Sequence, residues 1–141
     1  MNDLTQRHEG TKITKEEREE LSRRVIGAAV EVHKQLGPGL LESVYEHCML
    51  DELQRRNIKV RAQIPVPLFY KGKELNKEFK LDLLVENELI VELKAVENLI
   101  PLYEVQVLTY LRLTDKTLGL LINFNEVLLK NGIRRVINGY N

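Results

Sequence analysis

The clearest structural signal in the sequence is a pair of apolar runs, FKLDLLV at residues 79–85 and LIVELKA at residues 89–95. Successive side chains of a β-strand point to opposite faces, so each run predicts a strand with one purely apolar face. The apolar faces comprise Phe79, Leu81, Leu83 and Val85 in the first run and Val91, Leu93 and Ala95 in the second. The other faces carry Asp82 in the first run, beside Leu84, and Glu92 with Lys94 in the second. We expect these three charges to converge across neighbouring strands.

The segment before these runs predicts a helical hairpin. Thr14 followed by Glu17 is a capping-box pattern, and apolar residues then recur at helical spacing as far as the Gly37-Pro38-Gly39 turn. A second helix is expected over residues 41–56. Residues 1–13 are polar and lack periodicity, so they predict a flexible arm ahead of one domain over residues 14–141.

The remaining segments predict a mixed sheet. Three strands should form a meander, and a helix should then connect them to further strands. In chain order we expect strands at 59–70, 74–85 and 88–95, a helix from Pro101 to Arg112, a strand buried on both faces at 117–124, and an interrupted strand at 128–137. The predicted fold class is therefore α/β (α+β), with a mixed central sheet flanked by helices.

Bulk composition sets limits on partners and location. The 141 residues are 43% hydrophobic, which suffices for one core, and 21 basic residues balance 21 acidic ones. Without net positive charge, any contact with nucleic acid must be local. A single cysteine excludes an intrachain disulfide and favours a reducing compartment, and no apolar run is long enough for a membrane span. We expect a cytoplasmic protein with no membrane partner.

Two interpretations of the charged strand faces are open from the residues alone. Hard oxygen ligands such as Asp82 and Glu92 suit Mg²⁺ or Mn²⁺. The alternative is an ordinary ion pair between Glu92 and Lys94 on a solvated face. Helices that cover the sheet would desolvate charges in the middle of a strand, which is costly unless the charges are paired or bound to a metal. The expected covering helices therefore favour the metal site.

The segment GLLESVY at residues 39–45 has the form G-x-x-E-x-x-Y and resembles the motif of the GxxExxY proteins, a prokaryotic group of the PD-(D/E)xK nuclease superfamily. The resemblance covers nearly the whole chain after about residue 20 and implies a restriction-endonuclease-like core. Asp82 matches the strand aspartate of that superfamily, Glu92 and Lys94 match its E-x-K motif, and Glu42 matches an acid from the first core helix. Leu81 stands where the superfamily's name has proline.

A second motif supports the same resemblance. Gln106 and Tyr110 form Q-x-x-x-Y, which resembles a helix of the exonuclease-like branch. Their spacing places them on one helical face, with Tyr103 beside them.

The resemblance implies hydrolysis of a phosphodiester with the help of Mg²⁺ or Mn²⁺. Asp82 and Glu92 would bind the ion, the Leu93 carbonyl would add a ligand, and Glu42 would bind directly or through water. We expect Lys94 to keep its charge beside two carboxylates and to act on the water and the transition state electrostatically. Gln106 would hydrogen-bond the water or a ligand. Tyr110 would contact phosphate or the substrate strand, although filling the helix–sheet interface explains it equally well.

The leading functional hypothesis is thus a metal-dependent nuclease acting on nucleic acid, with DNA favoured. A second hypothesis is a catalytically weak or inactive module of the same fold that binds nucleic acid or a protein partner. A third is a structural or oligomeric protein, and the sequence leaves a homodimer open. All forms of the nuclease hypothesis require Asp82, Glu92 and Lys94 to meet in one pocket, which we expect to face the second helix.

Overall fold

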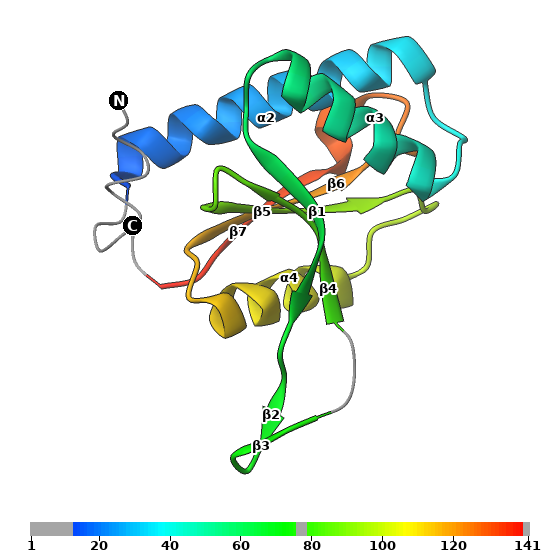
Figure 1. The fold of residues 1–141 in the computed structure, drawn as a ribbon. Helices are drawn as coiled ribbons and strands as arrows, with labels where there is room; N and C mark the ends of the chain where they lie inside the picture. The colour runs from blue at the N-terminus through cyan, green and yellow to red at the C-terminus, as the bar shows by residue number, and fades with distance from the viewer. Residues whose placement is uncertain (1–12, 76–78, 140–141) are drawn as a thin grey trace.

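A mixed sheet with helices on both faces forms the body of the molecule (Figure 1). The computed structural model describes residues 13–75 and 79–139. Its helices are α2 (Lys15–Leu36), α3 (Glu42–Arg55) and α4 (Pro101–Thr114), with a 3-10 turn η1 (Leu129–Gly132). Its strands are β1 (Val60–Val66), β2 (Phe69–Tyr70), β3 (Lys73–Glu74), β4 (Phe79–Val85), β5 (Leu89–Lys94), β6 (Leu118–Asn123) and β7 (Ile133–Ile137).

The main sheet has the strand order β1-β4-β5-β6-β7. β1, β4 and β5 form the predicted antiparallel meander, β6 pairs parallel with β5, and β7 pairs antiparallel with β6. The parallel pair requires a crossover, which α4 provides. The predicted fold class, a mixed sheet flanked by helices, is confirmed.

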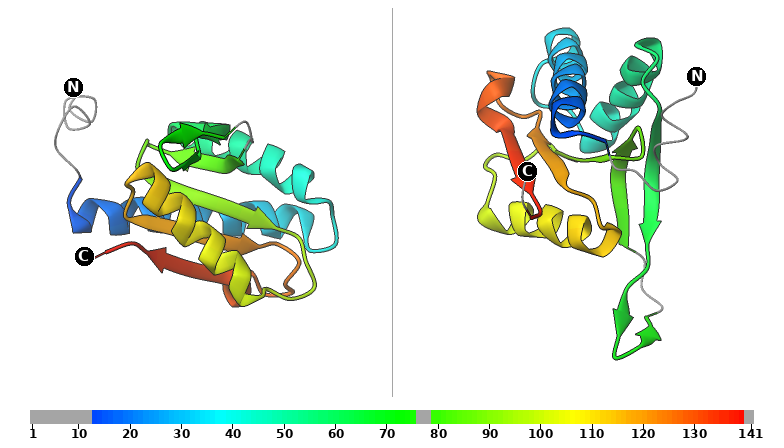
Figure 2. Two further views of the ribbon diagram at one scale, coloured as in Figure 1. Left: turned by 90° about the horizontal axis from the view of Figure 1, so that it is seen from below. Right: turned by 90° about the vertical axis from the view of Figure 1, so that its left-hand side faces the viewer.

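The two faces of the sheet bury separate apolar clusters. α2 and α3 cover one face and α4 covers the other, as the views in Figure 2 show. The α2/α3 side packs against Leu83, Val91 and Leu120, whereas the α4 side packs against Ile90 and Leu121. Among the charged groups on the central strands, Glu92 is buried, whereas Asp82 and Lys94 are partly exposed.

α2 begins as predicted. The Thr14 hydroxyl accepts from the Glu17 N–H at 3.1 Å, and the Glu17 carboxylate accepts from the Thr14 N–H at 2.8 Å. Ile13, the last residue of the predicted arm, is buried, so packing extends to this residue. The rest of the predicted arm, residues 1–12, lies outside the described residues.

The loop between α2 and α3 is held by Tyr45, the tyrosine of the G-x-x-E-x-x-Y segment. Its hydroxyl donates to the Gly37 carbonyl at 2.6 Å and accepts from the Leu40 N–H at 3.1 Å. The buried ring stacks on Phe124 with the ring centres 4.6 Å apart. Gly39 has φ 100°, which favours glycine. The motif therefore has a structural role: it fixes where α3 begins.

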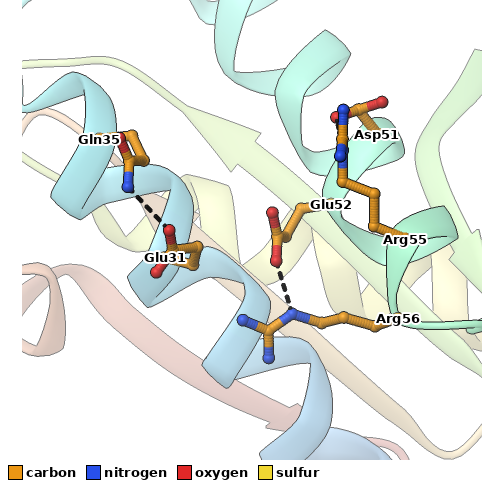
Figure 3. A network of polar contacts seen from close by, with 6 residues as sticks. All are labelled: Glu31, Gln35, Asp51, Glu52, Arg55 and Arg56. Carbon is orange, nitrogen blue, oxygen red and sulfur yellow. Dashed lines mark hydrogen bonds and ion pairs between the residues drawn. The ribbon is translucent and has the colours of Figure 1, made fainter.

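Polar contacts on α2 and α3 are shown in Figure 3. Arg55 pairs with Asp51 at 2.6 Å and Arg56 with Glu52 at 2.7 Å, each one helical turn apart. The Arg56 guanidinium extends over α2, where a side chain at Gly27 would contact it at 3.4 Å. Ion pairs this exposed contribute little to stability.

β1 changes the face that its side chains present at Gln63. Val60 and Ala62 pack in the α2/α3 cluster, whereas Ile64 and Val66 pack in the α4 cluster. Gln63 itself has φ 54°, in the left-handed region, and a residue in that conformation reverses the alternation of an extended strand.

β4 makes the same change opposite Gln63. Leu83 and Val85 belong to the α2/α3 cluster, but Leu81 packs on the α4 side. The strict alternation that we predicted for residues 79–85 is therefore wrong at Leu81. The change falls at Asp82, which lies opposite Gln63 between the paired residues of the ladder.

Three predicted strands are divided in the structure. The strand predicted at 74–85 is β3 at its start and β4 from Phe79, and residues 76–78 lie outside the described residues. The segment 59–70 stops at Val66 and resumes as β2, because Pro67 lacks the N–H that a continued ladder needs. β2 and β3 form a small hairpin around Lys71 and Gly72 that projects beyond the sheet (Figure 1). The segment 128–137 is half 3-10 turn, and only its second half is a strand.

Candidate active site

The backbones of β4 and β5 stop pairing where their carboxylates lie. Leu83 opposite Val91 is the last ladder pair, and Asp82 and Glu92 occupy the next position. The Asp82 N–H donates to Glu92 Oε2 at 2.9 Å, and the Leu93 N–H donates to Asp82 Oδ2 at 2.8 Å. Each carboxylate thus accepts a backbone hydrogen bond from the opposing strand. The structure brings Asp82 and Glu92 together, as expected.

Lys94 lies on the same side of β5 as Glu92. Its Nζ is 4.4 Å from the centre of the Tyr103 ring of α4, within range of a cation–π contact. Its charge also lowers the pKa of both carboxyl groups, against larger effects that raise them. We expected the three charges to face the second helix. Glu92 and Lys94 share the α4 side of the sheet with Ile90, yet both also interact electrostatically with Glu42 at the start of the second helix.

α3 supplies two further acids near Asp82. Burial first, and then repulsion from Asp82, raise the pKa of Glu42 at the start of the helix. The same two causes, in the same order, raise the pKa of Glu46 one turn later. Sequence reasoning identified Glu42 and missed Glu46, although spacing of four residues on a helix was an available signal.

Gln63 connects these acids. Its Nε2 donates to Glu46 Oε1 at 2.8 Å, and a hydrogen bond from its side chain also lowers the pKa of Asp82. Gln63 reaches both groups from β1 in the left-handed conformation, and strained backbone of this kind clusters at functional sites. Sequence reasoning missed Gln63, because nothing in its neighbours announces a positive φ.

Asn123 fixes the chain just beyond Lys94. The fully buried Asn123 side chain accepts from the Val96 N–H at 3.0 Å and donates to the Val96 carbonyl at 2.9 Å. The Phe124 N–H donates to the Lys94 carbonyl at 2.9 Å. Sequence reasoning treated this segment as uniformly apolar and missed Asn123. A polar residue inside a buried strand was the signal.

The electrostatics of the carboxylate pair favour an added cation. Glu92 is only 9% exposed. Burial, and then repulsion from Asp82, raise its pKa to about 8 despite the opposing effects of the Asp82 N–H and Lys94. Burial also raises the pKa of Asp82. Burial and mutual repulsion thus disfavour two negative charges here, and a divalent ion would offset them.

The donor set fits Mg²⁺ or Mn²⁺ with open positions for water. In residues 13–75 and 79–139, no three His, Cys, Asp or Glu side chains converge closely enough to enclose a metal. Mg²⁺ does not need such enclosure, because it binds through one or two carboxylates and keeps several waters. The Leu93 carbonyl as a ligand remains a prediction.

The Q-x-x-x-Y residues of α4 are placed differently from each other. Burial, and then the charges of Glu92 and Asp82, raise the pKa of Tyr110, so its phenol lies near the carboxylates. Gln106 is exposed one turn earlier and forms none of the hydrogen bonds that join the described site residues. The two side chains line one groove on the outer side of α4.

The five-stranded mixed sheet, with helices on both faces and this charged cluster at its centre, has the architecture of a restriction-endonuclease-like protein. A model of the PD-(D/E)XK nuclease superfamily matches residues 19–136, and the chain belongs to that superfamily. The resemblance seen in the sequence is thereby confirmed at superfamily level, while membership of the GxxExxY group stays a prediction. No curated protein and no solved structure matches the chain significantly. None of the helices described for this chain could cross a membrane.

Proposed function

We propose that this protein is a nuclease, dependent on Mg²⁺ or Mn²⁺, that hydrolyses phosphodiester bonds of DNA. The observation that carries the proposal is the reciprocal pairing of Asp82 and Glu92 at the break in the ladder, with Lys94 beside them. Membership of a nuclease superfamily supports the same reaction class.

Asp82 and Glu92 would hold the ion, with the Leu93 carbonyl as a further ligand and Glu42 binding directly or through water. A bound divalent ion acidifies its water and stabilises charge on the transferring phosphoryl group. Asp82 is oriented for this task by the Leu93 N–H and by Gln63.

Lys94 offsets negative charge that develops on the phosphorane-like transition state. The ring of Tyr103 holds its ammonium on the α4 side of the sheet. Tyr110, whose pKa is raised by burial and then by the charges of Glu92 and Asp82, would contact the scissile phosphate, and Gln106 would act further along the substrate strand or on the attacking water.

Cleavage of labelled single- and double-stranded DNA and RNA, with Mg²⁺, Mn²⁺ or EDTA, tests the proposal. We expect cleavage only with metal, and a loss of roughly 100-fold or more in Asp82→Asn, Glu92→Gln and Lys94→Ala. Glu16→Gln is the matched control, because Glu16 is exposed on α2, away from the cluster. Activity that survives Glu92→Gln and Lys94→Ala would exclude this site. Retention of nucleic acid without turnover would instead support the binding-module hypothesis.

A further inference from the structure

An apolar groove runs along the outer side of α4, next to the carboxylates. It has a volume of about 270 Å³ and lies between the helix and two residues on either side of the β2–β3 hairpin, Leu68 and Phe79. Its apolar lining consists of Leu68, Phe79, Leu102, Val105 and Leu113. Leu102 and Val105 are 55% and 54% exposed, which is unusual for adjacent large apolar side chains and indicates a binding surface.

One side of the groove is polar and leads to the catalytic cluster. Gln106, Thr109 and Tyr110 line it, and their spacing places them on one strip of α4. Burial, and after it the charges of Glu92 and Asp82, raise the pKa of Tyr110. The groove and the site therefore share a side chain, so a chain lying in the groove would reach the carboxylates.

The β2–β3 hairpin continues this surface outward. Phe69 and Tyr70 directly follow Leu68 and are 59% and 62% exposed, although aromatic rings of this size are normally covered. Lys71 lies in the turn and Lys73 follows it, and the Lys71 ammonium is 5.5 Å from the centre of the Tyr70 ring. Aromatic faces next to ammonium groups complement stacked bases with adjacent phosphates.

We propose that the groove and hairpin bind single-stranded DNA, whose unstacked bases cover the apolar lining and stack on Phe69 and Tyr70. This inference rests on the proposed function and specifies its substrate. A duplex turns its phosphates outward and hides its base faces, whereas the groove lining contains no lysine or arginine. A second copy of the chain seated there would cover Tyr110, which the site needs.

Binding is measured separately from cleavage, by fluorescence anisotropy of a labelled single-stranded oligodeoxynucleotide and of its duplex in EDTA. The single strand should bind more tightly than the duplex. Tyr70→Ala should weaken single-strand binding about 5- to 150-fold, and Tyr70→Phe should retain it, because stacking contributes about 1–3 kcal/mol per base. Affinity should depend weakly on salt, with a log–log slope of about −1 to −2 from two lysines.

Val105→Glu and Val127→Glu form a matched pair. Both place a carboxylate on an exposed valine, but only Val105 lines the groove, while Val127 is 83% exposed beyond β6. The first substitution should abolish single-strand binding and the second should leave it unchanged. Equal binding of duplex and single strand, or full binding by Val105→Glu, would overturn the inference.

Two further outcomes separate the inference from the function beneath it. If duplex DNA is cleaved in a way that requires Asp82 but tolerates Val105→Glu, the groove proposal is wrong and the nuclease proposal stands. If binding depends on the groove but no metal-dependent cleavage occurs, the nuclease proposal is wrong and the groove proposal stands. If sedimentation shows a dimer that Val105→Glu converts to a monomer, the groove is a protein interface and the inference is wrong.

Discussion

A proton held by Glu92 links the stability of the protein to pH. The folded pKa of Glu92 is about 8, whereas its ordinary value is 4.5. The folded state therefore binds more protons than the unfolded state between these values. The stability that this carboxyl contributes is complete below about pH 4.5 and is lost as pH rises through about 8.

We predict that in EDTA the free energy of unfolding falls by about 1–4 kcal/mol from this residue as pH rises from 5 to 8. Urea denaturation across that range measures it. Glu92→Gln should flatten the slope and be more stable than the parent protein above pH 8, because its neutral amide has no charge to bury. An unchanged slope in Glu92→Gln would show that other groups cause the dependence.

The backbone strain at Gln63 destabilises the fold but places its side chain where it can hydrogen-bond the site carboxylates. Its φ of 54° costs about 1 kcal/mol, and glycine would relieve that cost. We predict that Gln63→Gly raises the midpoint of urea unfolding but lowers the cleavage rate about 10-fold, since Glu46 and Asp82 lose their amide partner. Asn57→Gly is the control: Asn57 has φ 60° in an exposed turn after α3, so stability should rise without loss of cleavage. Unchanged cleavage in Gln63→Gly would deny Gln63 a positioning role.

At the scale of single residues, the sequence allowed us to predict site residues whose charge differs from the apolar residues around them. Asp82, Glu92 and Lys94 stand out because each is charged within an apolar strand. Glu46 lies on a helix rich in charges, where one more carboxylate is ordinary. Gln63 acts through its backbone conformation, which no residue pattern announces. Whether these residues form a catalytic site is still a prediction.

The position of α4 depends on a close approach to β6. A Cβ at Gly119 would lie 2.6 Å from Val107 Cγ1, so the helix rests on a strand position that has no side chain. α4 also carries Tyr103, whose ring contacts Lys94, and Tyr110, whose pKa is raised by burial and then by the charges of Glu92 and Asp82. The spacing between this helix and the sheet therefore controls one side of the site.

We predict that Gly119→Ala destabilises the protein by about 1–3 kcal/mol and lowers cleavage, because α4 must move outward. Thermal unfolding and initial cleavage rates measure the two effects. Val107→Ala removes the obstructing atom, so the double variant should recover much of the stability lost in Gly119→Ala. Strictly additive losses would mean that the steric contact is not the cause.

Element prediction succeeded where periodicity was long and failed where it was interrupted. The helical hairpin, the meander and the buried strand β6 follow from apolar spacing and capping residues. The change of face at Gln63 could not be predicted from the sequence. The apolar residues of β1 occupy every second position on both sides of Gln63, so their spacing does not show that they pack on opposite faces of the sheet. Pro67 was the available signal for the separate hairpin, because proline ends a ladder.

At the scale of the whole molecule, the chain carries no net charge and holds an acidic pair largely away from water. We therefore expect a bound metal ion to stabilise the folded protein. A single domain over residues 14–141, a homodimer and a cytoplasmic location remain predictions. Metal that binds only the folded state raises the unfolding temperature as its concentration rises above the Kd.

We predict that millimolar Mg²⁺ or Mn²⁺ raises the unfolding temperature by several degrees near pH 8, and by less near pH 5.5, because binding displaces the proton of the carboxylate pair. Asp82→Asn should abolish the rise. Asp51→Asn is the control, since Asp51 pairs with Arg55 on exposed α3. A rise that persists in Asp82→Asn would place the ion elsewhere.

The parallel pairing of β5 with β6 determines how much of the chain must be synthesised before the charged cluster can assemble. Asp82, Glu92 and Lys94 are all translated before α4, yet β5 gains its parallel neighbour only after residue 118 and the lock on Val96 only at Asn123. Pairing across a crossover must await the whole intervening segment. A nascent chain that has emerged only through Thr114 thus holds every acidic group of the cluster in an unfinished scaffold. We expect ribosome-bound chains stalled at that length to be inert toward nucleic acid, whereas chains that expose residue 123 and beyond acquire the assembled centre.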